Sequence, residues 1–507
     1  MKNLISVVVM ILILVACSGK KKGFIPIMGV LALTGDGASA GCTSGEELTS
    51  SNGDESDSPA VSDTQVVVQT DLGNGTTEDF TYQSTLELPV EVNVLYDNGT
   101  PIPNAYVTIN KEISGNPLTS KLTDENGIVN DTLTVDATQK KIYAVVSIGD
   151  SVSTQKEASI PEPIIDESKG TITISKIIIT FVIFSDSQIE TQITDRDGDG
   201  VNDVDDAYPD DSSKSATIRF PEGSVDPVTG VLDPKTAVHT ISFEDLYPNA
   251  GDADLNDYTV QLWYEEDLNS QGKIVEIRGY YQHVAHGAGY VHNFKLKLPS
   301  NSNISTGTVK FGRLVTDASG TLLQKSTMRN ITTNELSDGL LILEDSDKTI
   351  PSSNVKGEEF KPGYISKIRL LFSNPIDKQV LGKRPYDLFI YVKNTKQNIH
   401  FPGRYTKEDG SDKFVDKNKF PFAIMVPGVW AWPYERCDIR ITDVSKLDGG
   451  CYKKSVTGYE NFKPWAESLG GLFQDWYNYV VSDRVYYSVF DKLPSKLLEP
   501  LTPTSLE

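Results

Sequence analysis

Short runs of β-branched residues, separated by tight-turn signals, constrain the fold of this chain more than any other feature. In Leu88–Tyr96, valines alternate with other residues, so one face of an extended segment points inward. The pairs Asn98-Gly99 and Asn126-Gly127 suit hairpin turns. Similar apolar runs cover Ala105–Asn110, Ile142–Ile148 and Thr171–Phe184. The pattern predicts a small β-sandwich over residues 79–190.

The β pattern continues beyond Ser215, and long helical periodicity is scarce. A helix is expected only in Asn461–Ser468 or after Leu472. The chain is therefore expected to be mainly β, with a larger β-rich domain over 216–507 and a join at 191–215. Asn98–Ile109 followed by Leu122–Gly127 resembles the immunoglobulin-like and transthyretin-like modules of bacterial surface proteins. This resemblance implies an immunoglobulin-like sandwich that acts as a spacer or a binding module.

The N-terminus has the order of an export signal. Met1–Asn3 precedes an apolar run that ends at Ala16, which is too short to span a bilayer. Leu14–Cys17 resembles a lipobox, so residues 1–16 are predicted to be a cleaved signal peptide and Cys17 the lipidated residue. A second basic and apolar pair ends near Cys42, which is the alternative acylation site. An ordinary leader whose cysteine is accidental is the other interpretation.

The segment from Thr43 to about Glu78 has few large apolar residues. Ser50–Ser58 is typical, since it contains only Ser, Asn, Gly, Asp and Glu. Such a composition does not bury enough apolar surface to offset the entropy of ordering. Residues 17–78 are therefore expected to be a lipidated, flexible tether that lifts the folded part off a membrane.

The net charge restricts the class of partner, and the cysteine content restricts the disulfide bonds. The formal net charge of −23 argues against nucleic acid and favours divalent cations. There are four cysteines, too few for a dense disulfide framework. Cys437 and Cys451 are close in sequence, and export would expose them to an oxidising compartment, so a bridge between them is predicted.

The sharpest local motif is the aspartate-rich run from Asp195 to Asp206. Calcium-binding loops place oxygen ligands at positions 1, 3, 5, 7, 9 and 12, with glycine at position 6. Gly200 is at position 6 here, and Tyr208-Pro209 would stop the exiting helix of an EF-hand. The run looks more like the calcium repeats of thrombospondin type 3, and a solvated acidic linker is the alternative. The predicted calcium ligands are Asp195, Asp197, Asp199, the Val201 carbonyl, Asp203 and Asp206.

A second acidic cluster lies around the expected strand that begins at Tyr258. Its oxygen donors stand on a short turn, and two further carboxylates can fold back towards them. The cluster is a second candidate for a hard cation, and a polar turn with an Asx cap is the alternative. The candidate ligands are Glu244, Asp245, Asp252, Asp254, Asn256 and Asp257.

These motifs together carry a resemblance to a known family. The calcium-type loop, then Phe243–Pro248 and Gly251–Tyr258, resembles the LruC-domain lipoproteins of spirochaetes and other diderm bacteria. The likeness continues through Arg384–Ile390 and Trp432–Glu435 and covers about Thr194 to Val489. It implies a lipoprotein of the cell outer membrane that meets the host immune system. It implies no enzymatic activity.

Catalysis has no positive signal in the sequence. There is no phosphate-binding glycine loop and no His-Glu-x-x-His. His283, His286 and His292 are expected to face opposite sides of an extended strand, which argues against zinc. The C-terminal part of the chain is rich in aromatic residues. Such residues more commonly pack in a hydrophobic core than form a ligand platform. They are Trp430, Trp432, Trp465, Trp476 and Tyr477.

The function expected from these patterns is a calcium-stabilised binding or structural module, held in the outer membrane by lipid. Its ligand would be a protein or a carbohydrate, in adhesion or in contact with host or envelope, and not a nucleic acid. Whether it faces the periplasm or the outside stays open. The alternative from another class is a metal-dependent hydrolase of an envelope or extracellular polymer, using Asp252, Asp254 and Asp257.

Overall fold

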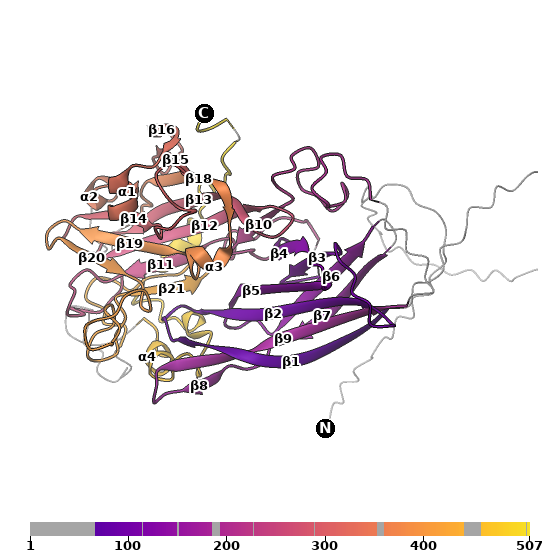
Figure 1. Cartoon of the computed structure of the whole chain (residues 1–507). Coiled ribbons are helices and arrows are strands. Elements are labelled where there is room, and N and C mark those ends of the chain that lie inside the picture. The colour runs from indigo at the N-terminus through magenta and orange to yellow at the C-terminus, as the bar shows by residue number, and fades with distance from the viewer. Residues whose placement is uncertain are drawn as a thin grey trace, which may run out of the picture. The chain divides into compact units, whose positions relative to one another are not determined.

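The computed structural model describes residues 66–113, 115–149, 152–184, 193–226, 228–287, 289–351, 359–440, 458–502 and 504–507. The predicted signal peptide, Cys17, Cys42 and Cys451 lie outside these residues. The expectation of a mainly β chain is confirmed, because nearly all regular elements are strands (Figure 1). The described residues belong to one compact unit.

The first nine strands form two sheets. They are β1 Val66–Asp79, β2 Thr85–Tyr96, β3 Tyr106–Asn110, β4 Pro117–Leu122, β5 Ile128–Asp136, β6 Lys141–Ile148, β7 Val152–Ser159, β8 Ile164–Asp166 and β9 Thr171–Ile183. One sheet has the order β1-β9-β2-β5, with β8 also paired to β9, and the other has the order β4-β3-β6-β7. Figure 1 shows the long strands β1, β2 and β9 side by side.

Alternating side chains explain the packing of these sheets. Val90, Val92 and Val94 of β2 are at most 2% exposed, as the sequence pattern predicts. On β9, Ile179 and Phe181 alternate with partly exposed residues and are fully buried. Each such side chain contributes about 1.5–3 kcal/mol when removed from water. The two inward faces share one hydrophobic core.

The predicted tether is too long at its C-terminal end. Residues 66–78, expected to be flexible, belong to strand β1, which pairs antiparallel with β9 from Val66 opposite Ile183 to Asp79 opposite Thr171. Much of β1 is exposed, which agrees with the low apolar content of this segment. Its backbone pairing along β9 provides the order that composition did not indicate, and it covers an edge that would otherwise be open.

The later strands form two further sheets. The strands are β10 Ala216–Phe220, β11 His239–Phe243, β12 Tyr258–Leu268, β13 Ile274–Ala285, β14 His292–Lys297, β15 Val309–Thr316, β16 Leu322–Asn330, β17 Leu340–Leu343, β18 Ile365–Ile376, β19 Asp387–Val392, β20 Gln397–His400 and β21 Ala423–Pro427. An eight-stranded sheet has the order β16-β15-β18-β13-β12-β11-β21, with β10 also paired to β12. A four-stranded sheet has the order β17-β14-β19-β20.

Helices are few and short among the described residues. They are α1 Thr333–Asp338, α2 Ser346–Thr349, α3 Lys378–Leu381 and α4 Phe462–Glu467, with 3-10 turns η2 Trp476–Asn478 and η3 Tyr487–Asp491. The position of α4 agrees with the helix expected in Asn461–Ser468. Helix α1 begins with a capping box, in which Thr332 and Glu335 each accept from the other's backbone N–H.

The strands β11, β12 and β13 of the eight-stranded sheet are buried on both faces, whereas the edge strand β16 is largely exposed. One face shares a core with the four-stranded sheet, where Phe243 and Tyr258 contact Phe294. The other face, with Trp263 and Tyr280, belongs to the core that also holds the sandwich. The aromatic residues considered as a ligand platform lie in this second core, since Trp430, Trp432, Trp465 and Trp476 are at most 1% exposed. They are packing residues.

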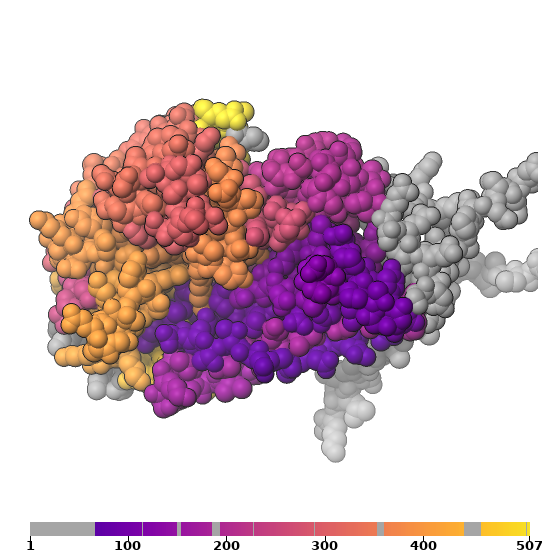
Figure 2. Space-filling view, in the orientation of Figure 1, coloured from indigo at the N-terminus to yellow at the C-terminus, as the bar shows by residue number. Residues whose placement is uncertain are grey.

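Polar contacts also join the sandwich to the later sheets. The Lys378 ammonium of α3 donates to Asp131 Oδ2 of β5 at 3.1 Å and to the Thr119 hydroxyl at 2.9 Å. The backbone N–H of Leu122 donates to the Ser270 carbonyl at 2.9 Å. The space-filling view shows the surface of the sandwich in direct contact with the surface of the later part (Figure 2). The sandwich therefore packs directly against the later sheets.

The Asp131–Lys378 pair gives a first testable prediction. Burial opposes ionisation of Asp131, but Lys378, Lys121 and Thr119 outweigh it and lower its pKa to about 2. Because the folded-state pKa is below the unfolded value of ~3.9, the stabilisation is present above about pH 4 and is lost as the pH falls through about 2. Asp131→Asn leaves the Lys378 charge without its partner and should lower the free energy of unfolding by about 3 kcal/mol at neutral pH.

Denaturant unfolding over a series of pH values measures this effect. Glu162→Gln is the matched control, because Glu162 pairs with Lys140 where the side chains are 71% and 55% exposed. That exposed pair should contribute less than about 1 kcal/mol. Equal effects of the two substitutions would contradict the assignment of Asp131 to a buried ion pair.

Candidate metal centre

The calcium-type loop connects β9 to β10, and its first half is organised around Asp195. Asp195 Oδ1 accepts from the Gly198 N–H at 2.7 Å, and Oδ2 accepts from the Gly200 N–H at 3.0 Å. Both glycines have positive φ, +81° and +94°, which other residues adopt at a cost. The glycines therefore let the chain turn tightly around the first carboxylate.

The carboxylates of Asp195, Asp197 and Asp199 converge. One ligand atom from each lies within 4.8 Å of the others. Asp197 Oδ2 and Asp199 Oδ2 are buried atoms without a hydrogen-bond partner. Burial, followed by repulsion from Asp199, Asp197 and Asp195, raises the pKa of Asp206 to about 6. Three of the predicted ligands are thus brought together.

The other two predicted ligands of this loop differ in placement. Asp203 accepts from the Arg196 backbone N–H at 3.0 Å and from Arg196 Nε at 2.9 Å, so its carboxylate is paired within the loop. Position 9 of a calcium loop often reaches the ion through water, which is compatible with this geometry. The Val201 side chain is 1% exposed and anchors the loop.

The loop contacts both parts that it joins. A Cβ on Gly200 would lie 3.2 Å from Leu122 Cδ1 on β4. Burial, together with Asp205 and Asp206, raises the pKa of Tyr106 on β3. On the other side, the Tyr208 hydroxyl donates to Asp267 Oδ1 of β12 at 2.8 Å. The order of the loop is therefore coupled to both neighbours.

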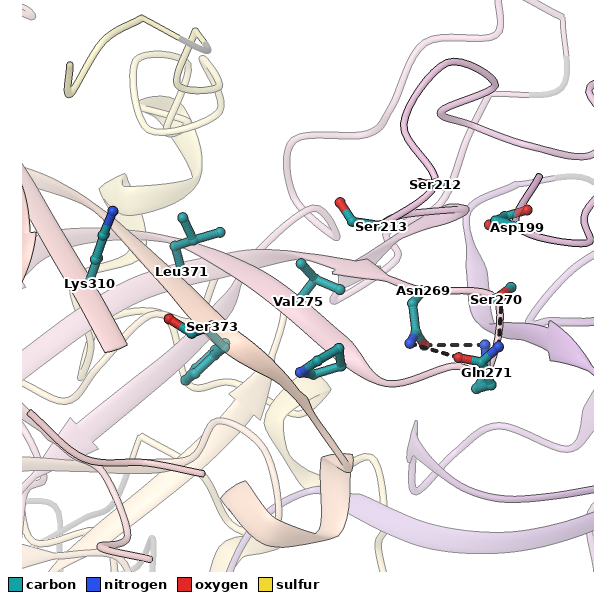
Figure 3. Close-up of a pocket in the computed structure, with 12 residues that line it drawn as sticks. Asp199, Ser212, Ser213, Asn269, Ser270, Gln271, Val275, Lys310, Leu371 and Ser373 are labelled. Carbon is teal, nitrogen blue, oxygen red and sulfur yellow. Dashed lines mark hydrogen bonds between the residues drawn. The ribbon is translucent and has the colours of Figure 1, made fainter. Parts of the chain in front are cut away.

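A pocket of about 510 Å³ borders this loop (Figure 3). Asp199 and Ser213 come from the loop, Asn269 and Gln271 from the β12–β13 turn, and Ser373 from β18. Asn269 Nδ2 donates to Gln271 Oε1 at 2.9 Å within the lining. The lining offers hydroxyl and amide groups, which suit a polar ligand.

The second acidic cluster is assembled by the β11–β12 register. Phe243 pairs with Tyr258, so the residues after β11 lie opposite those before β12. The Asp245 N–H donates to Asp257 Oδ2 at 2.7 Å. The candidate ligands converge, and ligand atoms of Glu244, Asp252 and Asp254 lie within 4.8 Å of one another. Glu244 and Asn256 are 0% exposed, Asp254 1%, Asp245 2% and Asp257 5%, while Asp252 is partly exposed.

A third segment completes this cluster, and sequence reasoning missed it. Arg436 N–H donates to Asp254 Oδ2 at 2.6 Å, and Asn256 Nδ2 donates to the Pro433 carbonyl at 3.0 Å. Glu435 lies between these contacts. Burial, and then Asp252, Asp257 and Asp245, raise its pKa to about 8. Glu435 stands far along the chain from the turn, so no spacing rule connects it to the cluster. We call Glu244, Asp245, Asp252, Asp254, Asn256, Asp257 and Glu435 the buried acidic site.

The electrostatics of this site are unfavourable without a ligand. Burial, and repulsion from Asp257 and Asp254, raise the pKa of Glu244 well above its usual value. Burial and Asp252 raise the pKa of Asp245 to about 7. Carboxylates so close in a low-dielectric interior need protons or a cation to coexist. Their oxygen-only donor set suits a hard cation.

The three histidines do converge, contrary to the expectation that they face opposite sides. Ring centroids of His283 and His286 are 6.1 Å apart, and those of His286 and His292 are 5.9 Å apart. Strand β13 ends at Ala285, so the strand rule does not apply to His286 or to His292, which begins β14. His286 Nδ1 lies 2.8 Å from the Ile350 carbonyl, and Nε2 lies 3.0 Å from the Tyr290 carbonyl.

One histidine contacts the buried acidic site. His292 Nε2 lies 2.9 Å from Asp245 Oδ2, and its Nδ1 lies 3.1 Å from Ser346 Oγ. This is the order of a Ser–His–Asp triad, but the three residues are 1%, 0% and 2% exposed. A nucleophile must reach its substrate, so the arrangement is better described as a buried hydrogen-bond network.

Comparison with known proteins gives one family match. Residues 272–477 match a domain of unknown function, DUF4842. The matched segment includes the three histidines and Glu435 and begins after Asp257. No curated protein matches the chain. One solved structure, of a putative lipoprotein from Bacteroides ovatus, is 13% identical with a TM-score of 0.45, over 75% of this chain and 98% of that one. Among the described residues, no helix is long and apolar enough to cross a membrane.

The close approach of Gly287 to the buried acidic site gives a second prediction. The Gly287 N–H donates to the Asn256 carbonyl at 2.9 Å, and a Cβ there would lie 1.5 Å from Asn256 Oδ1. Gly287→Ala must displace the Asn256 side chain and should lower the free energy of unfolding by about 1–3 kcal/mol. Thermal and denaturant unfolding measure the change.

Gly289→Ala is the control, because a Cβ at Gly289 meets no atom within 4 Å. It should change the free energy of unfolding by less than about 0.5 kcal/mol. If Gly287→Ala were equally neutral, Asn256 would not lie against Gly287.

Proposed function

We propose that this protein is a lipid-anchored envelope protein of the LruC-domain type, and that its β-rich body is a calcium-stabilised binding or structural module. The observation that carries the proposal is the calcium-type loop, which contacts β4 on one side and β12 on the other. Calcium bound there would hold the sandwich and the eight-stranded sheet in a fixed relation.

The charge of the loop supports a cation. From Asp195 to Asp211 there are eight aspartates and one arginine. Without a counter-ion, the carboxylates repel one another. Carboxylates at the spacing of a calcium loop bind extracellular calcium with Kd values of ~10⁻⁴ to 10⁻³ M. Export to the envelope supplies that concentration range. The predicted export signal and the calcium-type loop therefore support the same proposal.

The ligand class follows from charge and from the pocket beside the loop. The net charge of −23 disfavours nucleic acid. The polar lining of Ser213, Asn269 and Gln271 suits a protein or carbohydrate ligand, as in adhesion or in contact with host or envelope. A hydrolase that uses Asp252, Asp254 and Asp257 is less favoured, because Asp254 and Asp257 are 1% and 5% exposed and only Asp252 is partly exposed.

The anchor is tested at Cys17, which lies outside the described residues. Metabolic labelling with a fatty acid should mark the protein, and Cys17→Ser should abolish the label, because the thiol carries the lipid. Cys42→Ser is the matched control and should retain it. Loss of label only in Cys42→Ser would move the start of the mature chain.

The calcium loop is tested by Asp199→Asn. The substitution removes one carboxylate from the converging group and should weaken calcium binding by calorimetry, with faster limited proteolysis near Asp205 in calcium. Asp210→Asn removes the same charge from an exposed residue that pairs with Arg196, and it should behave as wild type. Proteolysis of the wild type that is equal with calcium and with chelator, together with no binding heat, would refute the loop site. Calcium-dependent hydrolysis of an envelope polymer would overturn the non-enzymatic proposal.

A further inference from the structure

The buried acidic site differs from the way the fold treats its other buried carboxylates. Glu266 is 0% exposed and accepts from Arg384 at 2.8 and 2.6 Å. Asp267 is also 0% exposed and pairs with Arg278 and Lys214, both at 2.7 Å. In both cases a cationic side chain offsets the cost of burying the charge.

In the buried acidic site, Glu244, Asp254 and Asp257 instead accept from backbone N–H groups. Asp245 also contacts the His292 ring, and the Glu435 carboxylate, with its side chain 21% exposed, lies 3.8 Å from Arg436 Nε. Glu244 Oε2 accepts from Leu255 at 3.4 Å, and Asp257 Oδ2 accepts from Asp245 at 2.7 Å. Asp254 accepts from the N–H of Asn256 at 3.3 Å and from that of Arg436 at 2.6 Å. Partial positive charges from amides do not balance this many carboxylates.

An unpartnered oxygen points to the missing ligand. Glu244 is 0% exposed, and its Oε1 has no hydrogen-bond partner. A buried carboxylate oxygen left unpaired is costly, so such atoms in folded proteins usually face an ion, water or ligand. Ligand atoms of Asp252 and Asp254 lie within 4.8 Å of that of Glu244, a spacing that one cation can bridge.

We infer that the buried acidic site holds a structural calcium ion, separate from that of the surface loop, which ties the segment around Glu435 to the β11–β12 pair. The donors are carboxylate and amide oxygens, which favour calcium over zinc, because zinc prefers nitrogen and sulfur. They come from three chain segments, whereas magnesium is usually held by only one or two protein carboxylates. Magnesium keeps several waters, so it fits this site less well than calcium.

The position of the site explains what the ion would do. The 252–257 turn contacts the 433–439 segment through Asn256 and Pro433, and the Ile439 N–H donates to the Ala253 carbonyl at 2.9 Å. Just before that segment, Trp430 and Trp432 enter the shared core. Calcium at this junction therefore fastens the C-terminal aromatic residues to the eight-stranded sheet. Its loss should loosen residues 433–440 first.

The test uses the full lipidated chain in detergent, with calcium counted by mass spectrometry after dialysis against calcium-free buffer. Glu244→Gln keeps the side-chain shape and removes one charged ligand, so it should lose about one calcium ion per chain relative to wild type. Melting should show a crossover, because the variant has one fewer ligand in calcium and less charge repulsion in chelator. We expect a lower Tm than wild type in calcium and a higher Tm in chelator.

Glu266→Gln is the matched control, since it neutralises a buried glutamate that already has a cationic partner. It should keep the wild-type calcium content and lower the Tm in both conditions. Wild-type calcium content in Glu244→Gln, or a Tm above wild type in both conditions, would overturn the inference and indicate buried carboxyl groups that share protons.

A further measurement separates this site from the loop and does not require Glu244→Gln to fold. Asp199→Asn, which weakens calcium binding at the loop, should retain slowly exchanging radioactive calcium. In this variant, chelator should increase the hydrogen exchange of residues 433–440. No retained calcium in Asp199→Asn together with unchanged exchange would refute the buried ion. Wild-type binding in Asp199→Asn would instead remove the loop proposal and leave this one in place.

Discussion

Burial of the central strands of the eight-stranded sheet on both faces is the constraint on which the rest of the structure depends. Its central strand β12 is buried along almost its whole length, between the four-stranded sheet on one face and the shared core on the other. A polar side chain on such a strand must find a partner inside the protein. Arg384 pairs with Glu266, and Arg278 pairs with Asp267. The carboxylates that have no arginine partner of this kind lie beyond the ends of the strands.

The two acidic regions solve the same electrostatic problem in different settings. The loop carboxylates stand on a partly exposed turn shaped by glycines, where water can share the charge. The buried acidic site lies beyond the β11–β12 pair, where three segments meet and Glu244, Asp245, Asp254 and Asp257 are almost fully enclosed. Coulomb repulsion is stronger there because the local dielectric is low. The same class of cation would thus be exchangeable in one place and structural in the other.

A protein stabilised in this way would be suited to its proposed compartment. Extracellular calcium modules need only weak sites, because the ion is abundant outside cells and scarce in the cytosol. The acidic regions would then be neutralised after export, when the sandwich and the sheets pack together. Under this proposal, metal chemistry and localisation support one another, although the argument for each starts from different residues.

The sequence by itself determined the features that depend on near neighbours. Alternation along β2 predicted which valines are buried, because successive side chains of a strand point to opposite faces. The spacing of Asp195, Asp197 and Asp199 predicted that their carboxylates converge, since glycine turns act over a few residues. The cluster around Asp254 was visible for the same reason.

Only the tertiary structure decided the features that depend on distant contacts. Strand β1 exists because β9 offers it a hydrogen-bonding edge, which its polar composition does not reveal. Glu435 joins the buried acidic site, and His292 meets Asp245, because the chain returns to the β11–β12 pair from far along the sequence. Local periodicity carries no information on such returns. They are set by which buried surfaces pack together, a property of the whole chain.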